Sequence, residues 1–240
     1  MKYPGGKNNE GTFQWLINHM PPHVTYIEGF LGSGAIMRLK KPAQCSIGID
    51  SDSHVVEQFR QSTGVLARKS NGSIDDVNIF CDDTISYLQS NAQEFDHQTL
   101  IYLDPPYLMS TRRSKEKLYK HELTDEQHVE LLHAIKSLKC MVMISGYISE
   151  LYATELAKWR TDSLRVITRG GKPAIEYLWL NFPPPIELHD YRYLGANFRE
   201  REKIKRQKQR WIARLRRMPD LQRWAMFEAI DTVRRRDPQT

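Results

Sequence analysis

The amino-acid sequence predicts an α/β protein: a doubly wound sheet of about seven strands, mostly parallel with an antiparallel edge hairpin, plus a C-terminal basic helical extension. Three observations support this prediction. Apolar, β-branched runs of strand length recur along residues 1–182, and helical segments separate the first five runs. A short Gly-Gly-Lys-Pro turn joins the last two runs. After a run of three prolines, long basic stretches begin.

Each element of the sheet follows from the local pattern. The expected strands are the seven apolar runs Thr25–Phe30, Ser46–Asp50, Asn78–Cys81, Thr99–Leu103, Cys140–Ser145, Leu164–Thr168 and Glu176–Phe182. The helical segments between the first five runs are 33–40, 53–62, 84–92 and 124–138, and Thr124 with Gln127 forms a capping box at the start of the last one. This alternation predicts a Rossmann-like sheet, in which ligands bind at the carboxyl ends of the strands.

Size and composition exclude several classes of protein. A chain of 240 residues with 40% hydrophobic content can bury a core, so it is not disordered. Its apolar runs fall far short of the roughly 20 residues that span a bilayer, and its N-terminus has no secretion signal. Cys45, Cys81 and Cys140 are odd in number and lie in apolar surroundings, which indicates buried, reduced thiols. We therefore expect a cytoplasmic protein.

The positive charge of the chain is concentrated after the proline run, which marks the expected boundary between a domain at 1–185 and an extension at 186–240. Residues 187–240 contain 15 Lys or Arg against 8 Asp or Glu, and ten of these cations lie in Arg199–Arg217. The stretch is either a solvated helix face or a surface for a polyanion. The candidate nucleic-acid contacts in it are Arg199, Lys205, Arg206 and Arg210.

The same extension has an apolar seam. Ile204, Trp211, Leu215 and Met218 recur at helical spacing, Pro219 interrupts the pattern, and Leu221–Val233 resumes it. These residues predict a helix–turn–helix hairpin. Because Trp211, Leu215 and Met218, with Trp224 and Phe227, are costly to leave in water, we expect them to pack on the first domain or on a second copy. The protein is then a monomer, or a homodimer through these helices.

Glycines and carboxylates follow the first three expected strands. The first strand ends in Glu28-Gly-Phe30-Leu-Gly32-Ser-Gly34, a turn that allows a ligand to approach the backbone closely. Asp50 ends the second strand, where a carboxylate can bind both hydroxyls of a ribose, and Asp82-Asp83 ends the third. The alternative interpretation is that these aspartates cap helices.

The fourth strand runs directly into Asp104-Pro105-Pro106-Tyr107. The two prolines stiffen the turn and fix its carbonyl groups as acceptors. Asp104 and the Pro105 carbonyl can each accept one N–H of an exocyclic amino group, and the Tyr107 ring can stack on a flat base. A purely structural Pro-Pro turn is the alternative.

Residues 1–182 resemble the Dam-type (D12 class) DNA adenine-N6 methyltransferases in four motifs. These are Lys2-Tyr3-Pro-Gly-Gly-Lys7, the loop Glu28–Gly34, Asp50, and the DPPY tetrapeptide Asp104–Tyr107. The resemblance implies catalysis by the DPPY residues and S-adenosylmethionine as cofactor. The cofactor contacts that it implies are Tyr3, Lys7, Glu28, Phe30, Gly32, Gly34, Asp50, Asp82 and Asp104. Lys7 is expected to hold the cofactor's carboxylate.

The sequence departs from this family in one respect. Asp104 follows Asp83 by only 21 residues, which leaves no room for the recognition insert of Dam proteins. We expect Arg112, Arg113 and Lys115, or the basic extension, to contact the nucleic acid instead. DNA is the expected substrate, with a flipped adenine if it is double-stranded.

Three alternatives to DNA adenine methylation stay open. An RNA adenine methyltransferase could use the same residues, a cytosine-N4 enzyme usually carries Ser in place of Asp104, and a nonenzymatic nucleic-acid binder could retain the fold. The eight histidines show no metal-binding spacing with a cysteine, so no metal site is expected.

Overall fold

The computed structural model describes residues 7–66, 76–108, 122–167, 171 and 173–236. The chain divides into two compact units, Met1–Tyr191 and Arg192–Thr240. The sequence places this boundary at 185, but the segment that follows is held to the first unit. The His189 amide donates to the Met20 carbonyl at 2.9 Å, and the Lys41 amide donates to the buried Asp190 carboxylate at 2.8 Å.

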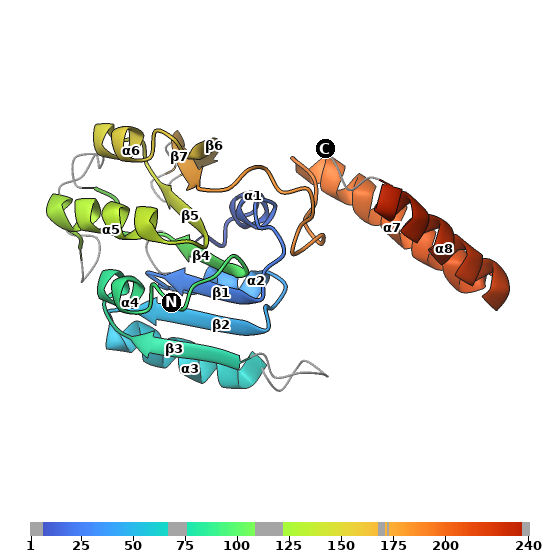
Figure 1. Cartoon of the computed structure of the whole chain (residues 1–240), viewed down its shortest axis with the longest axis horizontal. Coiled ribbons are helices and arrows are strands. Elements are labelled where there is room, and N and C mark those ends of the chain that lie inside the picture. Colours follow the sequence, from blue (N-terminus) through green and yellow to red (C-terminus); the bar gives the residue numbers. More distant parts are fainter. Residues whose placement is uncertain (1–6, 67–75, 109–121, 168–170, 172, 237–240) are drawn as a thin grey trace. The chain divides into compact units, whose positions relative to one another are not determined.

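The first unit is a seven-stranded sheet in the order β3-β2-β1-β4-β5-β7-β6 (Figure 1). Its strands are β1 (Thr25–Gly29), β2 (Cys45–Asp50), β3 (Asp76–Cys81), β4 (Thr99–Leu103), β5 (Met141–Gly146), β6 (Arg160–Ile167) and β7 (Pro173–Leu180). The first five pair in parallel, whereas β7 lies antiparallel between β5 and β6. This arrangement confirms the predicted fold class.

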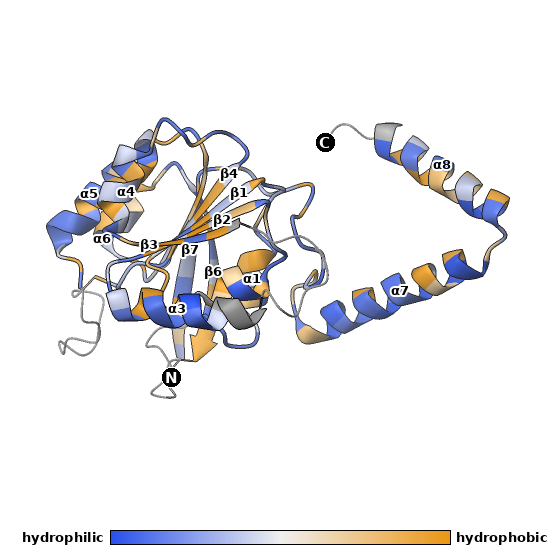
Figure 2. Ribbon diagram, turned by 90° about the horizontal axis from the view of Figure 1, so that it is seen from below, coloured by the Kyte–Doolittle hydropathy of each residue, from blue (hydrophilic) through white to orange (hydrophobic). Residues whose placement is uncertain are grey.

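Helices cover both faces of the sheet. On one face lie α4 (Thr84–Ser90), α5 (Asp125–Ser137) and α6 (Glu150–Glu155), and on the other lie α1 (Thr12–Ile17) and α3 (Ser53–Leu66) (Figure 2). The short α2 (Ala35–Leu39) packs beside α1. Every residue of the central strand β4 is buried, as expected for a parallel strand covered on both faces.

The core holds these layers together through two clusters of buried side chains. The larger cluster joins the sheet to α4, α5 and α6 and includes Leu88, Leu132 and Tyr152. The smaller one joins α3 to the strands through Leu31, Phe59 and Ile79. The predicted capping box is confirmed as well, since the Thr124 hydroxyl accepts from the Gln127 amide while the Gln127 side chain accepts from the Thr124 amide.

Some predicted features of the first unit are wrong. The helices α1 and α6 were not expected, because six residues are too few to show helical periodicity. The strand β6 starts at Arg160, earlier than expected, because it is an edge strand whose alternating polar residues hide its character. The three cysteines are free, but of the three only Cys140 is buried: Cys45 is half-buried, and Cys81 is exposed because it ends β3 at the other edge of the sheet.

The second unit consists of α7 (Phe198–Arg217) and α8 (Asp220–Arg236), joined at Met218 and Pro219. The break at proline is as predicted, but the helices diverge into an elbow and do not pack along each other as a hairpin (Figure 2). No residue of α7 is buried, and Trp211 and Trp224 are 51% and 67% exposed. The apolar seam is thus exposed within the second unit, and its expected packing on the first domain or on a second copy stays a prediction.

Among the described residues, no helix has both the length and the apolar character that crossing a membrane requires.

Candidate active site

The pairing of the strands brings the predicted site residues to one edge of the sheet. Gly29 of β1 pairs with Leu103 of β4, which in turn pairs with Ile144 of β5. The next residues along these parallel strands therefore emerge together at the carboxyl edge. Asp104 and Ser145 meet there, with the Ser145 hydroxyl donating to Asp104 Oδ1 at 3.0 Å.

A buried ammonium group lies at the centre of this edge. Lys7 Nζ is 2.7 Å from Asp104 Oδ1 and donates to the Tyr107 hydroxyl oxygen at 2.8 Å. It also lies 2.9 Å from Glu176 Oε1, and the Tyr107 hydroxyl donates to the same oxygen at 3.3 Å. The structure thus brings together three residues predicted for the site, from the N-terminal motif and from DPPY. Lys7 is engaged by two carboxylates, and its expected contact with a cofactor stays a prediction.

Sequence reasoning missed Glu176 as a site residue. Because β7 is antiparallel to β5, its early residues lie at the carboxyl end of β5, and Gly146 pairs with Tyr177. Glu176 is consequently buried next to Asp104 and not at the far edge of the sheet. The available signal was a single acidic residue inside the apolar run Ala174–Leu180.

The electrostatics of the cluster are set by burial and by the three charges together. Burial opposes the charge on Lys7, but Asp104, Tyr107 and Glu176 outweigh it and hold its pKa well above the ordinary value. Burial raises the pKa of Asp104, Lys7 acts against this, and Glu176 adds to it. By formal count, two carboxylates and one ammonium give the cluster a charge of −1.

Aromatic rings lie beside the acceptors. The ring centroids of Tyr107 and Tyr147 lie 4.3 Å apart. Tyr147 directly follows β5, and sequence reasoning also missed it. Pro105 is buried and Pro106 is half-buried, and residues 104–108 form no helix or strand. The turn thus presents a carboxylate, rigid backbone carbonyls and an aromatic pair within a few residues.

The glycine-rich loop after β1 has an unusual backbone. Phe30, Gly32 and Gly34 have φ values of 54°, 51° and 58°, and such a value is strained for phenylalanine. A Cβ on Gly34 would lie 2.2 Å from the Phe59 ring, so close packing on α3 requires glycine here. The loop is fixed further by the Phe30 amide, which donates to Thr84 Oγ1 at 3.2 Å.

The carboxylates after β2 and β3 have different roles in the structure. Asp50 accepts from the Gly32 amide at 2.8 Å and from the Asp52 amide at 2.9 Å, so it links the glycine loop to β2. Asp83 caps α4 by accepting from the Ser86 amide, as the capping interpretation predicted. Asp82 is exposed at the end of β3. Binding of a ribose by Asp50 stays a prediction.

Glu28 lies beneath the loop and is almost fully buried. Its Oε2 accepts from the Tyr26 hydroxyl at 3.0 Å and from the Met37 amide at 2.7 Å, which ties β1 to α2. Burial raises its pKa from 4.5 to about 7, although both hydrogen bonds act against the shift. A direct contact between Glu28 and a cofactor stays a prediction.

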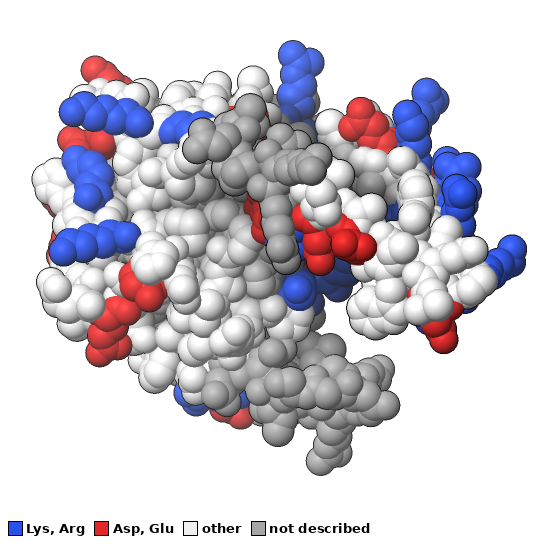
Figure 3. Space-filling view, turned by 45° about the vertical axis from the view of Figure 1, so that its right-hand side comes forward, with Lys and Arg blue, Asp and Glu red and all other residues white. Residues whose placement is uncertain are grey.

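The remaining candidate residues lie elsewhere or outside the described part of the chain. Tyr3, Arg112, Arg113 and Lys115 lie outside the described residues. Arg199, Lys205, Arg206 and Arg210 are exposed on α7, and Figure 3 shows Lys and Arg side chains projecting from the helical unit. No group of three His, Cys, Asp or Glu side chains that could hold a metal occurs within the described ranges.

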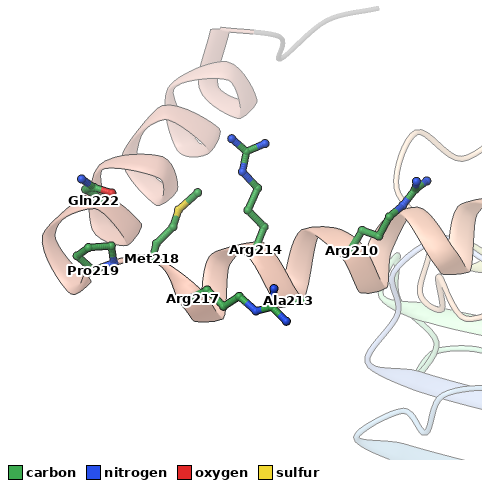
Figure 4. Close-up of a pocket in the computed structure, with 7 residues that line it drawn as sticks. All are labelled: Arg210, Ala213, Arg214, Arg217, Met218, Pro219 and Gln222. Carbon is green, nitrogen blue, oxygen red and sulfur yellow. The ribbon is translucent and has the colours of Figure 1, made fainter.

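The elbow between α7 and α8 has a hollow of its own (Figure 4). Three arginines line it, together with the residues at the helix junction: Arg210, Ala213, Arg214, Arg217, Met218, Pro219 and Gln222. The Arg214 guanidinium lies 5.7 Å from the centre of the Trp211 ring. Cations and an exposed aromatic ring therefore lie side by side on the second unit.

Comparison with known proteins gives one family and several structures. The family model described as Conserved hypothetical protein 95 matches residues 5–151. None of the curated proteins matches the chain. Among similar structures, that of a precorrin 8W decarboxylase from Methanobacterium thermoautotrophicum has 11% sequence identity and a TM-score of 0.49, and the match covers 75% of this chain and 94% of that chain. The putative methyltransferase yhhF from Escherichia coli has 16% identity and a TM-score of 0.47, with 75% of this chain and 90% of that chain covered. A SAM-dependent methyltransferase from Agrobacterium tumefaciens has 11% identity and a TM-score of 0.44, with 71% of this chain and 60% of that chain covered. Membership of the Dam-type family, which the sequence motifs resemble, stays a prediction.

Replacement of Glu28 by glutamine should change how stability depends on pH. In the unfolded chain the carboxyl group ionises near pH 4.5, whereas in the folded protein it keeps its proton to about pH 7. The folded state binds more protons over this window, so the free energy of unfolding falls by about 3 kcal/mol from this group as the pH rises. Denaturant unfolding over a pH series should show this decline in the wild type. Glu28→Gln should lack it, and the exposed Glu94→Gln should keep it. Equal declines in the wild type and Glu28→Gln would contradict the assignment.

Proposed function

The chain belongs to the family described as Conserved hypothetical protein 95, and we propose that it is an S-adenosylmethionine-dependent methyltransferase that modifies an exocyclic amino group of a nucleic-acid base. One observation carries the proposal: the acceptors at the carboxyl edge of the sheet already hold a nitrogen that donates hydrogen bonds. Lys7 Nζ lies within 2.7–2.9 Å of oxygens of Asp104, Tyr107 and Glu176. A site of this kind suits an amine, which brings its own N–H donors.

The residues at the carboxyl edge fit the cofactor. The loop Glu28–Gly34 combines three residues of positive φ, two of them glycines, so a ligand can approach its backbone. Asp50 and Asp82 end two neighbouring strands, where carboxylates accept from hydroxyl and amino groups. When bound, S-adenosylmethionine supplies a methyl group on a positively charged sulfur. Its binding residues would be this loop with Asp50 and Asp82.

The side chains after β4 would activate the amino group. Its lone pair is delocalised into the base, so the group is a poor nucleophile until acceptors draw its N–H bonds out of the plane. The contacts with Lys7 and Ser145 are both made by Asp104 Oδ1, so Oδ2 can accept from the target. The Pro105 carbonyl is the second acceptor, and Tyr107 provides a ring for stacking.

Charge complementarity supports the same reaction. As the amino nitrogen bonds to the methyl carbon, it becomes positive and its N–H bond breaks. The electrons of that bond stay on nitrogen, and the proton passes to Asp104. The net negative charge of the Lys7, Asp104 and Glu176 cluster stabilises the developing cation without moving, which is electrostatic catalysis by preorganised groups.

RNA is the substrate that we favour. The short connection between Asp83 and Asp104 holds the seven-residue helix α4 and the strand β4, with no recognition insert of the Dam type. Single-stranded RNA offers unstacked bases, which need no flipping from a duplex. DNA adenine-N6 methylation is the second candidate, favoured by the resemblance of the N-terminal and DPPY motifs.

The basic helix α7 provides a surface for the nucleic-acid backbone. Arg199, Lys205, Arg206 and Arg210 are exposed, and Trp211 with Arg214 adds a ring and a cation that suit bases and phosphates. A nonenzymatic binder would need only this surface. It would have no need for the buried charges at the sheet edge, which therefore favour an enzyme.

One experiment tests the activity and separates the substrates. The full chain is incubated with labelled S-adenosylmethionine and with RNA and DNA of matched sequence, and the nucleosides are then analysed. We expect label on an exocyclic nitrogen of the RNA. Label on DNA adenine alone would select the second candidate, and label on neither would reject methyl transfer to nucleic acid.

Asp104→Asn should slow transfer by about 10²- to 10⁴-fold and leave cofactor binding within a few fold of the wild type. The amide cannot take the proton, and loss of a proton acceptor typically costs 10²- to 10⁴-fold in rate. Single-turnover kinetics and calorimetry measure the two properties. The exposed Asp125→Asn is the matched control and should behave like the wild type. A rate within tenfold of the wild type in Asp104→Asn would refute the role of this residue.

Neutralising α7 should weaken nucleic-acid binding in a salt-dependent manner. For Arg206→Gln/Arg210→Gln, the log–log slope of affinity against salt should flatten by about 0.7 per lost contact on a single strand. The matched control is Lys139→Gln/Lys158→Gln, which removes two exposed cations before β5 and β6. If both pairs lower the slope equally, general charge and not α7 governs binding.

A further inference from the structure

A second carboxylate, Glu176, shares the buried ammonium of the site. Its Oε1 lies 2.9 Å from Lys7 Nζ, whose contact with Asp104 is 2.7 Å. The side chains of Lys7 and Glu176 are 6% and 5% exposed, against 21% for Asp104. Asp104 is thus the most exposed member of the cluster, whereas Lys7 and Glu176 are almost completely buried.

The position of Glu176 has an energetic cost that packing alone does not explain. A carboxylate taken out of water needs compensating partners, and here it finds Lys7 and the Tyr107 hydroxyl. An isolated Asp104–Lys7 pair would already be neutral. The second carboxylate makes the cluster negative and weakens the hold of Lys7 on Asp104.

We propose that Glu176 is a positioning residue, which shares Lys7 with Asp104 and so keeps Asp104 basic enough to take the proton of the target amino group. Through Tyr107 it also fixes the ring expected to stack on the base. The inference rests on the proposed methyl transfer and names how that site is tuned.

The chemistry requires this balance. When the nitrogen–methyl bond forms, the methyl–sulfur bond breaks and sulfur keeps its electron pair. The amino nitrogen then loses a proton to Asp104, which passes it to solvent. A fully neutralised Asp104 is a weak acceptor for that proton. Because Lys7 is shared between two carboxylates, it orients Asp104 through Oδ1 but leaves Asp104 more basic than an exclusive Asp104–Lys7 pair would.

Other titratable groups also face Asp104, and they must be separated from Glu176. The tyrosines are Tyr102, Tyr107, Tyr147 and Tyr152, and their pKa values are all raised by burial, so they stay neutral over the working range. The carboxyl group of Glu28 interacts with Asp104 and has a pKa raised to about 7 by its burial. The pH series must therefore be repeated in Glu28→Gln.

Direct titration of Asp104 tests the inference without relying on activity. The full chain is labelled with ¹³Cγ-aspartate, and the Asp104 signal is assigned with Asp104→Asn. Because Glu176 raises the pKa of Asp104, Glu176→Gln should move its midpoint to lower pH. Glu176→Asp keeps the charge and should leave the midpoint near its wild-type position, as should the exposed Glu94→Gln. An unmoved midpoint in Glu176→Gln would overturn the proposal.

Kinetics provide the second readout. In Glu176→Gln the acidic limb of the pH–rate profile should move to lower pH, and kcat should fall about 10- to 100-fold, the scale of one charge-assisted hydrogen bond. KM for S-adenosylmethionine should change less than about twofold. Glu176→Asp should recover part of the rate. If Glu176→Gln does not fold, the test relies on Glu176→Asp, which keeps the charge. An acidic limb of the Glu176→Asp pH–rate profile that is displaced from the wild-type position would reject the role of charge.

The two readouts distinguish failure of the proposed function from failure of the present inference. If the wild type transfers no methyl group to RNA or DNA, the proposed function fails while the titration still decides whether Glu176 tunes Asp104. If transfer occurs but both the midpoint and the acidic limb ignore Glu176, only the present inference fails.

Discussion

The ion cluster of Lys7, Asp104 and Glu176 is the interaction on which the candidate site depends. Two carboxylates lie within 3 Å of Lys7 Nζ, and Lys7 and Glu176 are almost completely buried. Removing one partner from such a cluster leaves an uncompensated buried charge, which typically costs about 3–5 kcal/mol. The cluster therefore connects the segment before α1, the turn after β4 and the strand β7 into one site.

The topology of the sheet makes this cluster possible. A parallel β7 would carry Glu176 away from the carboxyl edge, whereas the antiparallel strand brings it beside Asp104. The edge hairpin thus contributes a buried carboxylate to the candidate site. Backbone strain is concentrated at the same edge, where Phe30 has a positive φ and Gly34 packs against Phe59. Such strain is typical of loops that hold ligands.

Local helix signals, and not a buried core, determine the structure of the helical unit. Its helices have strong local signals: an Asn197 cap on α7, a helix break at Pro219, and a stripe of cations. Its apolar side chains nevertheless stay exposed, with Leu221 at 86%. Contiguous exposed apolar groups of this kind mark surfaces that meet another molecule. The arginines and Trp211 of α7 suit a nucleic acid, which is why we propose that helix as the surface that binds the substrate.

The sequence by itself determined the order of the seven strands along the chain, the antiparallel hairpin, the capping box at Thr124 and the place of Asp104 directly after β4. These features depend on local periodicity, capping and turn chemistry, which act over a few residues. Tertiary structure decided the rest. Lys7 and Asp104 are 97 residues apart, and Glu176 lies a further 72 along the chain, so only strand pairing brings them together. Short or edge elements such as α1, α6 and the start of β6 likewise escape local patterns, because long-range packing and not periodicity stabilises them.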